Sequence, residues 1–281
     1  MKKYLLCDLP RGGFGAILDR RIVVSKIAEN YNREVIFRIG DNQYDDPFEW
    51  TYDFNPQNID KNIIKFDYTN QKDSIVYFDH QHWLESIWIP SKRKRTPFTD
   101  GKIFNSYKLK NRYQKIVDDT LKKYPLIKES ISLHIRRGDI SNPITGHGKY
   151  TSLESLVQTC LDVINVYGKR PIYLNSDSVE AIHEVGRMLD KHNIQWFYDD
   201  DEIRYNGENW KIVLENPNLK IQETLVGIKI IYTMSESFHI VGANNVQFPK
   251  LASFLLSYRS NGSKGFTYVD WETEKKSYTL K

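Results

Sequence analysis

Apolar and polar positions along the first forty residues follow a pattern that predicts parallel α/β structure. The apolar stretch Tyr4–Cys7 is predicted to be a strand, and the following residues, 17–31, carry apolar side chains at helical spacing. Glu34–Ile39 is again short and apolar and is followed by Gly40, so it is predicted to be a second strand. A strand, a helix and a second strand in this order form the opening unit of a parallel sheet.

A second alternation of strands and helices occupies the later half of the chain. Residues 45–99 are irregular and are predicted to form long loops and short strands, and 108–124 is predicted to be a helix. The predicted strands that follow are 131–136, 171–175, 194–198 and 238–242, and the predicted helices are 151–166, 177–189, 222–234 and 249–256. We therefore expect an α/β protein with two Rossmann-like domains, 1–125 and 126–281, that face a cleft.

Composition excludes several classes of protein. The 281 residues are 40% hydrophobic and 27% charged, so the chain can bury a sizeable core. Its net charge of +4 is too small for a dedicated nucleic-acid binder, yet it would suit a pocket for a small anion. The apolar runs are too short for a membrane span or a signal peptide, and two cysteines make neither a disulfide framework nor a zinc site. These features predict a cytoplasmic protein.

The segment from His134 to Asp139 is the strongest candidate for chemistry. In a strand of period two, His134 and Arg136 point to one face and Arg137 to the other, and Gly138 then lets the chain turn. Ligands of open α/β sheets bind beyond the carboxyl ends of the strands, and the planar arginine side chain suits a diphosphate. The alternative is a surface turn in which an arginine pairs with an acidic residue; the position at the end of an apolar strand favours the binding site.

A glycine-rich loop follows the first predicted strand. Gly12-Gly13-Phe14-Gly15, preceded by Arg11, would let backbone N–H groups approach an anion at the start of a helix. The spacing is not that of the dinucleotide-binding fingerprint, and a tight turn that only packs a helix on the sheet is the equally weighted alternative. Arg11 favours a loop that faces the donor or the acceptor.

Together these motifs resemble one known family. His134-x-Arg136-Arg137-x-Asp139 is similar to the first motif of the α-1,2-, α-1,6- and protein O-fucosyltransferases. The glycine-rich loop resembles the start of the nodulation-type chitin-oligosaccharide α-1,6-fucosyltransferases. The segment 172–177 resembles the second motif of the family, and 223–225 with 239–248 lies where the third would fall.

The resemblance implies a GT-B-like fold in which residues 126–281 bind a nucleotide sugar and 1–125 lie on the acceptor side. It implies that Arg136 contacts the donor diphosphate, that Arg137 supports the site, and that His134 lies near the guanine or its ribose. The predicted donor-binding residues are Arg11, Gly13, Phe14, Gly15, His134, Arg136, Arg137, Ser176, Asp177, Glu223, Asn244, Asn245 and Gln247. An alternative for Asp177 is the N-cap of the next helix, because Glu180 would complete a capping box.

We therefore expect an inverting glycosyltransferase that transfers fucose from GDP-fucose to an oligosaccharide, with no metal and no other cofactor. The predicted catalytic residues are Arg136, with Asp139 as first candidate for the base and His147 as second. The family's usual residues after the motif aspartate are absent, since Ile140 stands there, which leaves the base and the donor sugar open. The alternatives are a transferase with another donor, such as UDP-xylose or a rhamnosyl nucleotide, and a non-catalytic nucleotide- or glycan-binding protein. The oligomeric state is not predicted.

Overall fold

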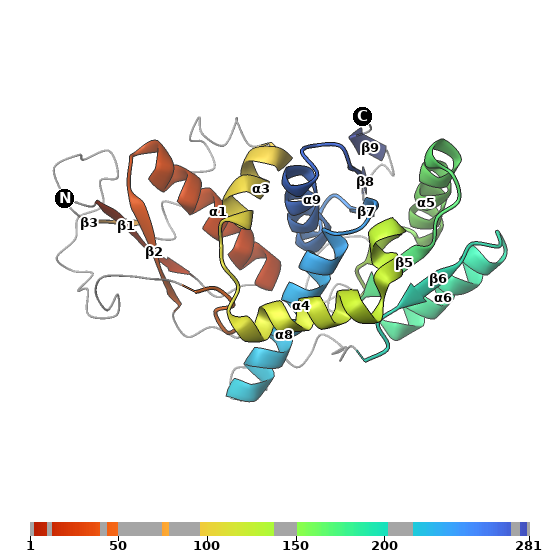
Figure 1. Cartoon of the computed structure of the whole chain (residues 1–281), viewed down its shortest axis with the longest axis horizontal. Helices are drawn as coiled ribbons and strands as arrows, with labels where there is room; N and C mark the ends of the chain where they lie inside the picture. Colours follow the sequence, from red (N-terminus) through yellow and green to blue (C-terminus); the bar gives the residue numbers. More distant parts are fainter. Residues whose placement is uncertain are drawn as a thin grey trace.

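The computed structural model describes residues 3–9, 13–39, 44–49, 75–78, 96–137, 151–201, 216–270 and 276–279. Two sheets lie at opposite sides of the molecule, with a layer of helices between them (Figure 1). Within the described residues, no helix combines the length and the apolar character needed to cross a membrane.

The N-terminal sheet is built around the first strand of the chain. Its order is β2 (Glu34–Ile39), β1 (Tyr4–Leu9) and β3 (Ile75–Phe78), and both pairings are parallel. Helix α1 (Phe14–Asn30) connects β1 to β2 and buries its apolar face on the sheet, where Leu5, Cys7 and Leu9 project from alternate positions of β1. The first strand–helix–strand unit predicted from the sequence is confirmed.

In the part of the chain that the structure describes, the C-terminal sheet has six strands. They are β4 (Ile131–Ile135), β5 (Ile172–Ser176), β6 (Trp196–Tyr198), β7 (His239–Ala243), β8 (Gly265–Val269) and β9 (Lys276–Thr279), in the order β6-β5-β4-β7-β8-β9. The first five are parallel and β9 is antiparallel. The chain moves outward from β4 through β5 to β6 and then returns to place β7 on the other side of β4. The topological switch point of the sheet therefore lies between β4 and β7.

The other helices of the described residues are distributed over both halves. They are α3 (Pro97–Asn105), α4 (Asn111–Lys123), the 3₁₀ turn η4 (Pro125–Glu129), α5 (Leu153–Tyr167), α6 (Val179–Asp190), α8 (Pro217–Met234) and α9 (Gln247–Arg259). Helices α1, α3, α8 and α9 lie between the two sheets (Figure 1). Helices α3 and α9 approach so closely that a Cβ atom on Gly101 would lie 1.9 Å from the carbonyl oxygen of Phe254.

One hydrophobic core runs through this central layer. It joins Phe14 and Ile22 of α1 and Phe104 of α3 to Ile231 of α8 and Leu251 of α9, all of them buried. The N-terminal segment and the C-terminal half therefore share buried surface rather than meeting only at a linker. The division of the chain into domains at residue 125 stays a prediction.

Several predicted elements differ from the observed ones. Helix α3 was not predicted, because the irregular pattern of 45–99 hides a start marked by Thr96, whose hydroxyl accepts a hydrogen bond from the Thr99 amide. Strands β8 and β9 were also missed. Helix α5 is capped by Ser152 rather than by Thr151, and helix α6 by Ser178 rather than by Asp177. The N-cap alternative for Asp177 is therefore wrong.

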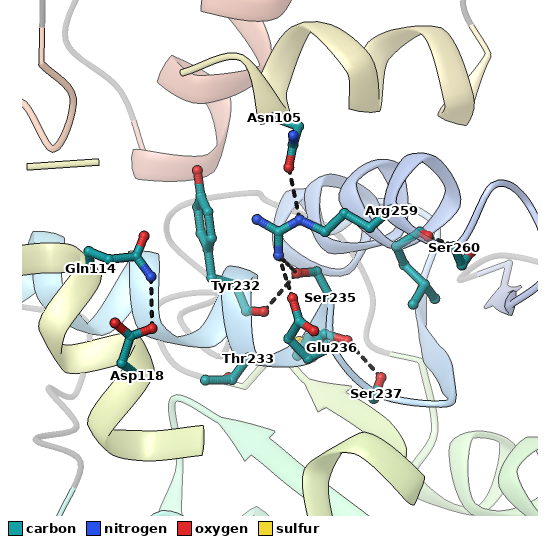
Figure 2. A network of polar contacts seen from close by, with 12 residues as sticks. Asn105, Gln114, Asp118, Tyr232, Thr233, Ser235, Glu236, Ser237, Arg259 and Ser260 are labelled. Carbon is teal, nitrogen blue, oxygen red and sulfur yellow. Dashed lines mark hydrogen bonds and ion pairs between the residues drawn. The ribbon is translucent and has the colours of Figure 1, made fainter. Parts of the chain in front are cut away.

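Paired polar groups close the edge of the C-terminal sheet at which β7 and β8 begin. Arg259, at the end of α9, donates hydrogen bonds to Asn105 (2.9 Å) and to Ser235 (3.1 Å) and pairs with Glu236 at 2.6 Å. Figure 2 shows these contacts between α3, α9 and the turn that precedes β7. Lys264 donates to the carbonyl oxygens of Glu236 and Ser237 from the other side. We call this edge the amino edge, and the opposite one, where β4, β5 and β7 end, the carboxyl edge.

Candidate functional site

The candidate site lies at the carboxyl edge of the C-terminal sheet, beside the switch point between β4 and β7. Open α/β sheets bind ligands in the crevice outside the carboxyl ends of the strands at such a point. His134 is the fourth residue of β4 and lies directly opposite Asn175 of β5 in the register. Its Cβ atom is also next to Gly242 of β7, at 3.9 Å from where a Cβ on that glycine would stand. His134 is thus at the centre of the edge.

His134 is a buried imidazole without a full set of hydrogen bonds. Its side chain is 5% exposed, and among the described residues its Nδ1 atom has no hydrogen-bond partner. Burial lowers its pKa to about 4, with Arg136 adding to the decrease and Asp177 opposing it. The ring is therefore neutral at physiological pH, and its buried Nδ1 atom can act as a donor or an acceptor, depending on the tautomer.

The two strands on either side of β4 end in further buried hydrogen-bond acceptors. The Oδ1 atom of Asn175, at the end of β5, and the Oδ1 atom of Asn244, directly after β7, both lack a hydrogen-bond partner among the residues that the structure describes. Asn244 is oriented by its other amide atom, which donates to Asp270 at 2.7 Å. Leaving buried polar groups unpaired costs about 1–3 kcal/mol each, so three such atoms at one edge indicate a place for a polar ligand.

Asp177 organises the two motif arginines. One carboxylate oxygen accepts a hydrogen bond from the backbone N–H of Arg137 at 2.7 Å, and the other lies 2.8 Å from Nη1 of Arg136. Because Ser178 caps the following helix, the Asp177 carboxylate is available for this contact. The guanidinium of Arg137 donates instead to the carbonyl oxygen of Thr151 at 3.2 Å. Arg136 is therefore held at the edge with 36% of its side chain exposed, while Arg137 is tied to the backbone.

The N-termini of two helices converge at this edge. Helix α9 begins at Gln247 and helix α1 at Phe14, and neither has a side-chain cap or an acidic residue in its first turn. The two starts touch, since a Cβ atom on Gly15 would stand 2.6 Å from the Cβ of Gln247. Unpaired N–H groups and the positive ends of two helix dipoles thus point to one region, which favours an anion.

Gly13, Phe14 and Gly15 are the residues of the predicted glycine-rich loop that the structure describes. The Phe14 side chain is 4% exposed, and a Cβ on Gly227 of α8 would lie 2.4 Å from its ring. Gly13 has open space around its Cβ position. Ligand binding by Gly13, Phe14 and Gly15 stays a prediction, with backbone N–H groups as the atoms available to carry it.

The other predicted residues have varied surroundings. Ser176 is buried and its Oγ accepts a hydrogen bond from the backbone of Ser178, so it shapes the turn after β5. Glu223 lies on α8, and burial raises its pKa. Asn245 is exposed in the turn between β7 and α9. The binding roles of these residues stay predictions. Three predicted site residues lie outside the described residues: Arg11, Asp139 and His147.

A group of three carboxylates elsewhere is neutralised by lysines. Single oxygens of Asp199, Asp200 and Asp201 lie within 4.8 Å of one another. However, Asp199 forms a buried ion pair with Lys229 at 2.6 Å, and Lys123 bonds to both Asp200 and Asp201. This acidic group has its own cations, and the acidic partner of Arg136 is Asp177.

Two residues of the site were not predicted. Asn175 carries an unpaired oxygen opposite His134, and its signal was a lone asparagine at the end of the apolar strand Ile172–Ser176. Phe248 places its ring 5.7 Å from the ring of His134. No local pattern marks Phe248, because an aromatic residue in the first turn of a helix is as common in a core as beside a ligand.

Comparisons with known proteins agree on the fold. No protein-family model matches the chain, and no curated protein matches it in sequence. Among solved structures, the chain is similar to NodZ α-1,6-fucosyltransferase soaked with GDP-fucose, with 12% identity, a TM-score of 0.60 and 99% of each chain covered. It is also similar to the fucosyltransferase NodZ from Bradyrhizobium, with 11% identity, a TM-score of 0.61, and 99% of this chain and 98% of that chain covered. A third structure, NodZ co-crystallised with GDP, has 12% identity and a TM-score of 0.59, with the same coverage. The predicted α/β, GT-B-like fold is confirmed: over nearly its whole length, this chain has the fold of these fucosyltransferases.

Proposed function

We propose that the protein is an inverting glycosyltransferase that transfers L-fucose from GDP-fucose to an oligosaccharide acceptor. One observation carries the proposal: the carboxyl edge at the switch point joins a charged arginine, a buried imidazole nitrogen that has no partner among the described residues, and two helix N-termini without a side-chain cap. This set of groups suits a molecule with a diphosphate and a polar ring system. The fold similarity to the NodZ structures, two of which were prepared with GDP-fucose or GDP, supports this ligand class.

The charges of the site support a reaction in which a diphosphate leaves. As the bond between the sugar and the diphosphate breaks, negative charge grows on the leaving group. Arg136, held in place by Asp177, and the N–H groups at the starts of α1 and α9 would stabilise that charge without rearranging. A site preset in this way stabilises the transition state more than the bound substrate. Such a reaction requires no metal, and the absence of a metal cofactor remains our prediction.

The acceptor hydroxyl must lose its proton during the attack on the anomeric carbon. A carboxylate or an imidazole serves as the base in such reactions. Asp139 and then His147 are the proposed candidates, since both follow the motif arginines in the chain. His134 is a poor candidate because Arg136 and burial oppose its protonation, which would have to accompany proton transfer. We assign His134 to donor binding instead.

Binding measurements with a panel of nucleotides test the proposal. GDP, GDP-fucose, UDP and UDP-xylose are added singly, and the shift of the thermal midpoint reports binding because a ligand of the native state stabilises it. We expect GDP and GDP-fucose to raise the midpoint of the wild-type protein but not that of Arg136→Ala. If only UDP and UDP-xylose raise the midpoint, the proposed donor is wrong, while the proposed binding site still stands.

The catalytic part of the proposal is tested with the same ligand. Wild-type protein is incubated with GDP-fucose, with and without a chitin oligosaccharide, and released GDP and the glycan mass are measured. An increase of the glycan mass by one fucose supports transfer. Binding of GDP-fucose without any release of GDP would identify a nucleotide-sugar-binding protein instead.

A further inference from the structure

Four aromatic rings form a continuous row from the N-terminal half to the candidate donor site. The ring centroids of Tyr44 and Phe14 are 5.1 Å apart, those of Phe14 and Phe248 are 6.4 Å apart, and those of Phe248 and His134 are 5.7 Å apart. The pairs are tilted or edge-on, which is the favourable geometry for aromatic contacts. The row begins in the segment after β2 and ends at the carboxyl edge, and its two central members come from the first turns of α1 and α9.

The two central rings are closely packed. A Cβ atom on Gly227 of α8 would lie 2.4 Å from the Phe14 ring, and a Cβ on Gly15 would lie 3.1 Å from the Phe248 ring. Both glycines therefore provide space that the rings use. A displacement of Phe14 towards Phe248 must therefore displace that ring, since the two are in edge-on contact. Phe14 and Tyr44 also line a small cavity, so the tight packing is confined to the contact between the two central rings.

Packing, rather than hydrogen bonding through Nδ1, holds this face of the His134 ring. Nδ1 has no partner among the described residues, and the contact of the ring with Phe248 is edge-on at an interplanar angle of 62°. His239 differs in this respect, since its Nε2 shares a hydrogen bond with Thr267. The orientation in which His134 meets a ligand therefore depends on Phe248.

The far end of the row is also fixed. Tyr44 precedes Asp45, whose backbone N–H donates to Thr224 of α8 at 2.9 Å and whose carboxylate accepts a hydrogen bond from Tyr113 of α4. Segment 44–49 thus cannot move without breaking contacts to two helices.

We infer that Phe248 is a positioning residue for His134, and that Phe14 acts on the same histidine through Phe248, so that the contact between α1 and α9 sets the affinity for the donor. This inference rests on the proposed function only in naming the donor nucleotide as the ligand of His134. It predicts that a substitution in α1, in the N-terminal half, changes binding at an edge of the C-terminal sheet.

Three phenylalanine-to-leucine variants test the inference by calorimetric titration with GDP. Phe248→Leu and Phe14→Leu alter the row, and Phe104→Leu is the matched control. Phe104 is fully buried in the same core as Phe14, and its ring contacts are with Phe48, Tyr107 and Tyr232. We expect the first two variants to bind GDP about tenfold more weakly than the wild type and the control to bind it unchanged, although all three lose thermal stability. Equal affinities in all four proteins would overturn the inference.

The double variant Phe14→Leu/Phe248→Leu tests whether Phe14 affects GDP binding through Phe248 or independently of it. If Phe14 acts through Phe248, the double variant binds GDP no more weakly than Phe248→Leu alone. Two losses that multiply to about a hundredfold would contradict this order of action. Phe14→Met, whose unbranched and flexible side chain adapts to the shape of the space, replaces Phe14→Leu if the latter does not fold.

A measurement without ligand distinguishes failure of this inference from failure of the proposed function. The NMR signal of the His134 imidazole is compared in the unliganded wild type and variants, where it should shift in Phe248→Leu and Phe14→Leu but not in Phe104→Leu. If the wild-type protein binds no nucleotide, the proposed function is wrong. The shifts of the His134 signal still test whether Phe248 and Phe14 position His134. An unchanged His134 signal in the two row variants would reject the positioning role whether or not GDP binds.

Discussion

The two edges of the C-terminal sheet are built from similar residues but pair them differently. At the amino edge, Arg259 bonds to three neighbours, and His239 shares a 3.0 Å hydrogen bond between its Nε2 and the Thr267 hydroxyl. At the carboxyl edge, His134 is as deeply buried, yet its Nδ1 lacks a partner among the described residues. Burial lowers the pKa of both histidines to about 4.

The comparison shows that burial and residue type alone do not mark a functional site. Both edges contain a buried neutral imidazole and an arginine paired with an acidic residue. The amino edge also has buried polar atoms without a hydrogen-bond partner among the described residues, the Nε of Arg170 and the hydroxyl of Tyr232. The difference is that the unpaired atoms of His134, Asn175 and Asn244 lie where the topology of the sheet places ligands, beside two helix N-termini. We therefore propose that the amino edge serves stability and the carboxyl edge binding, and the predictions below test this difference.

The largest expected effect comes from the two arginines. Arg136→Ala should lower kcat/KM for transfer by about 100- to 1,000-fold, because a preset positive charge on the leaving diphosphate is lost. Arg259→Ala should leave kcat/KM within about twofold and lower the free energy of unfolding by about 1–3 kcal/mol, since Glu236 loses its partner. Steady-state kinetics and urea unfolding of both variants measure these effects. A kinetic loss in Arg259→Ala equal to that in Arg136→Ala would remove the distinction between the edges.

Acid should destabilise the protein through both histidines. Each has a pKa of about 4 in the folded state and near 6.5 in the unfolded chain, so the unfolded state binds more protons between these values. The contribution of the two neutral histidines to the free energy of unfolding should therefore be fully present above about pH 6.5. It should decrease as the pH falls towards 4, by up to about 3 kcal/mol for each histidine. Urea unfolding at several pH values measures this, with His239→Leu as the control that should lose part of the pH dependence. Parallel curves for the wild type and the variant between pH 5 and 6.5 would contradict the assignment.

The same substitution at the two histidines should separate binding from stability. His134→Leu should weaken GDP binding by about 10- to 100-fold, because the ligand loses one buried hydrogen bond. His239→Leu should leave GDP binding unchanged and lower the free energy of unfolding by about 1–3 kcal/mol, since the Thr267 hydroxyl loses its partner. Calorimetric titration and chemical unfolding provide the two measurements. The opposite outcome, with weaker binding in His239→Leu alone, would exchange the roles of the edges.

A smaller effect is expected from the glycines at the start of α1. Gly15→Ala would place a Cβ 2.6 Å from that of Gln247 and push α1 away from α9, at a cost of about 1–2 kcal/mol in the free energy of unfolding. Gly13→Ala meets open space and should cost less than about 1 kcal/mol, through the poorer N-cap. Thermal unfolding and GDP titration of the pair measure this. Equal behaviour of the two variants would show that the contact between the helix starts is unimportant.

The sequence predicted most of the C-terminal sheet because its strands and helices carry strong periodicity. Strand β4 was predicted within one residue of its observed end, and α5, α6 and α8 were found with shifted starts. Helix α3, in the segment after β2, was not predicted, because it has few apolar positions and depends on packing against α9. The helix propensity of single residues gives no information about such a tertiary contact.

The site was predicted in part for the same reason. His134 and Arg136 follow from one strand and its end, so a local motif places them at the edge. The acidic partner of Arg136 is Asp177, some forty residues later in the chain, and no local pattern joins these two residues. Asn175 and Phe248 join the site only through the parallel register and the contact of α9 with α1, which no local pattern reveals.

The most direct test of the account is to observe both histidines while a nucleotide binds. Imidazole NMR signals of His134 and His239 are assigned with the two leucine variants and followed as GDP, and separately UDP, is added. The account predicts a saturable shift of the His134 signal with one of the nucleotides and no shift of the His239 signal. A nucleotide that binds without moving the His134 signal, or that moves the His239 signal instead, would contradict the assignment of the carboxyl edge as the binding site.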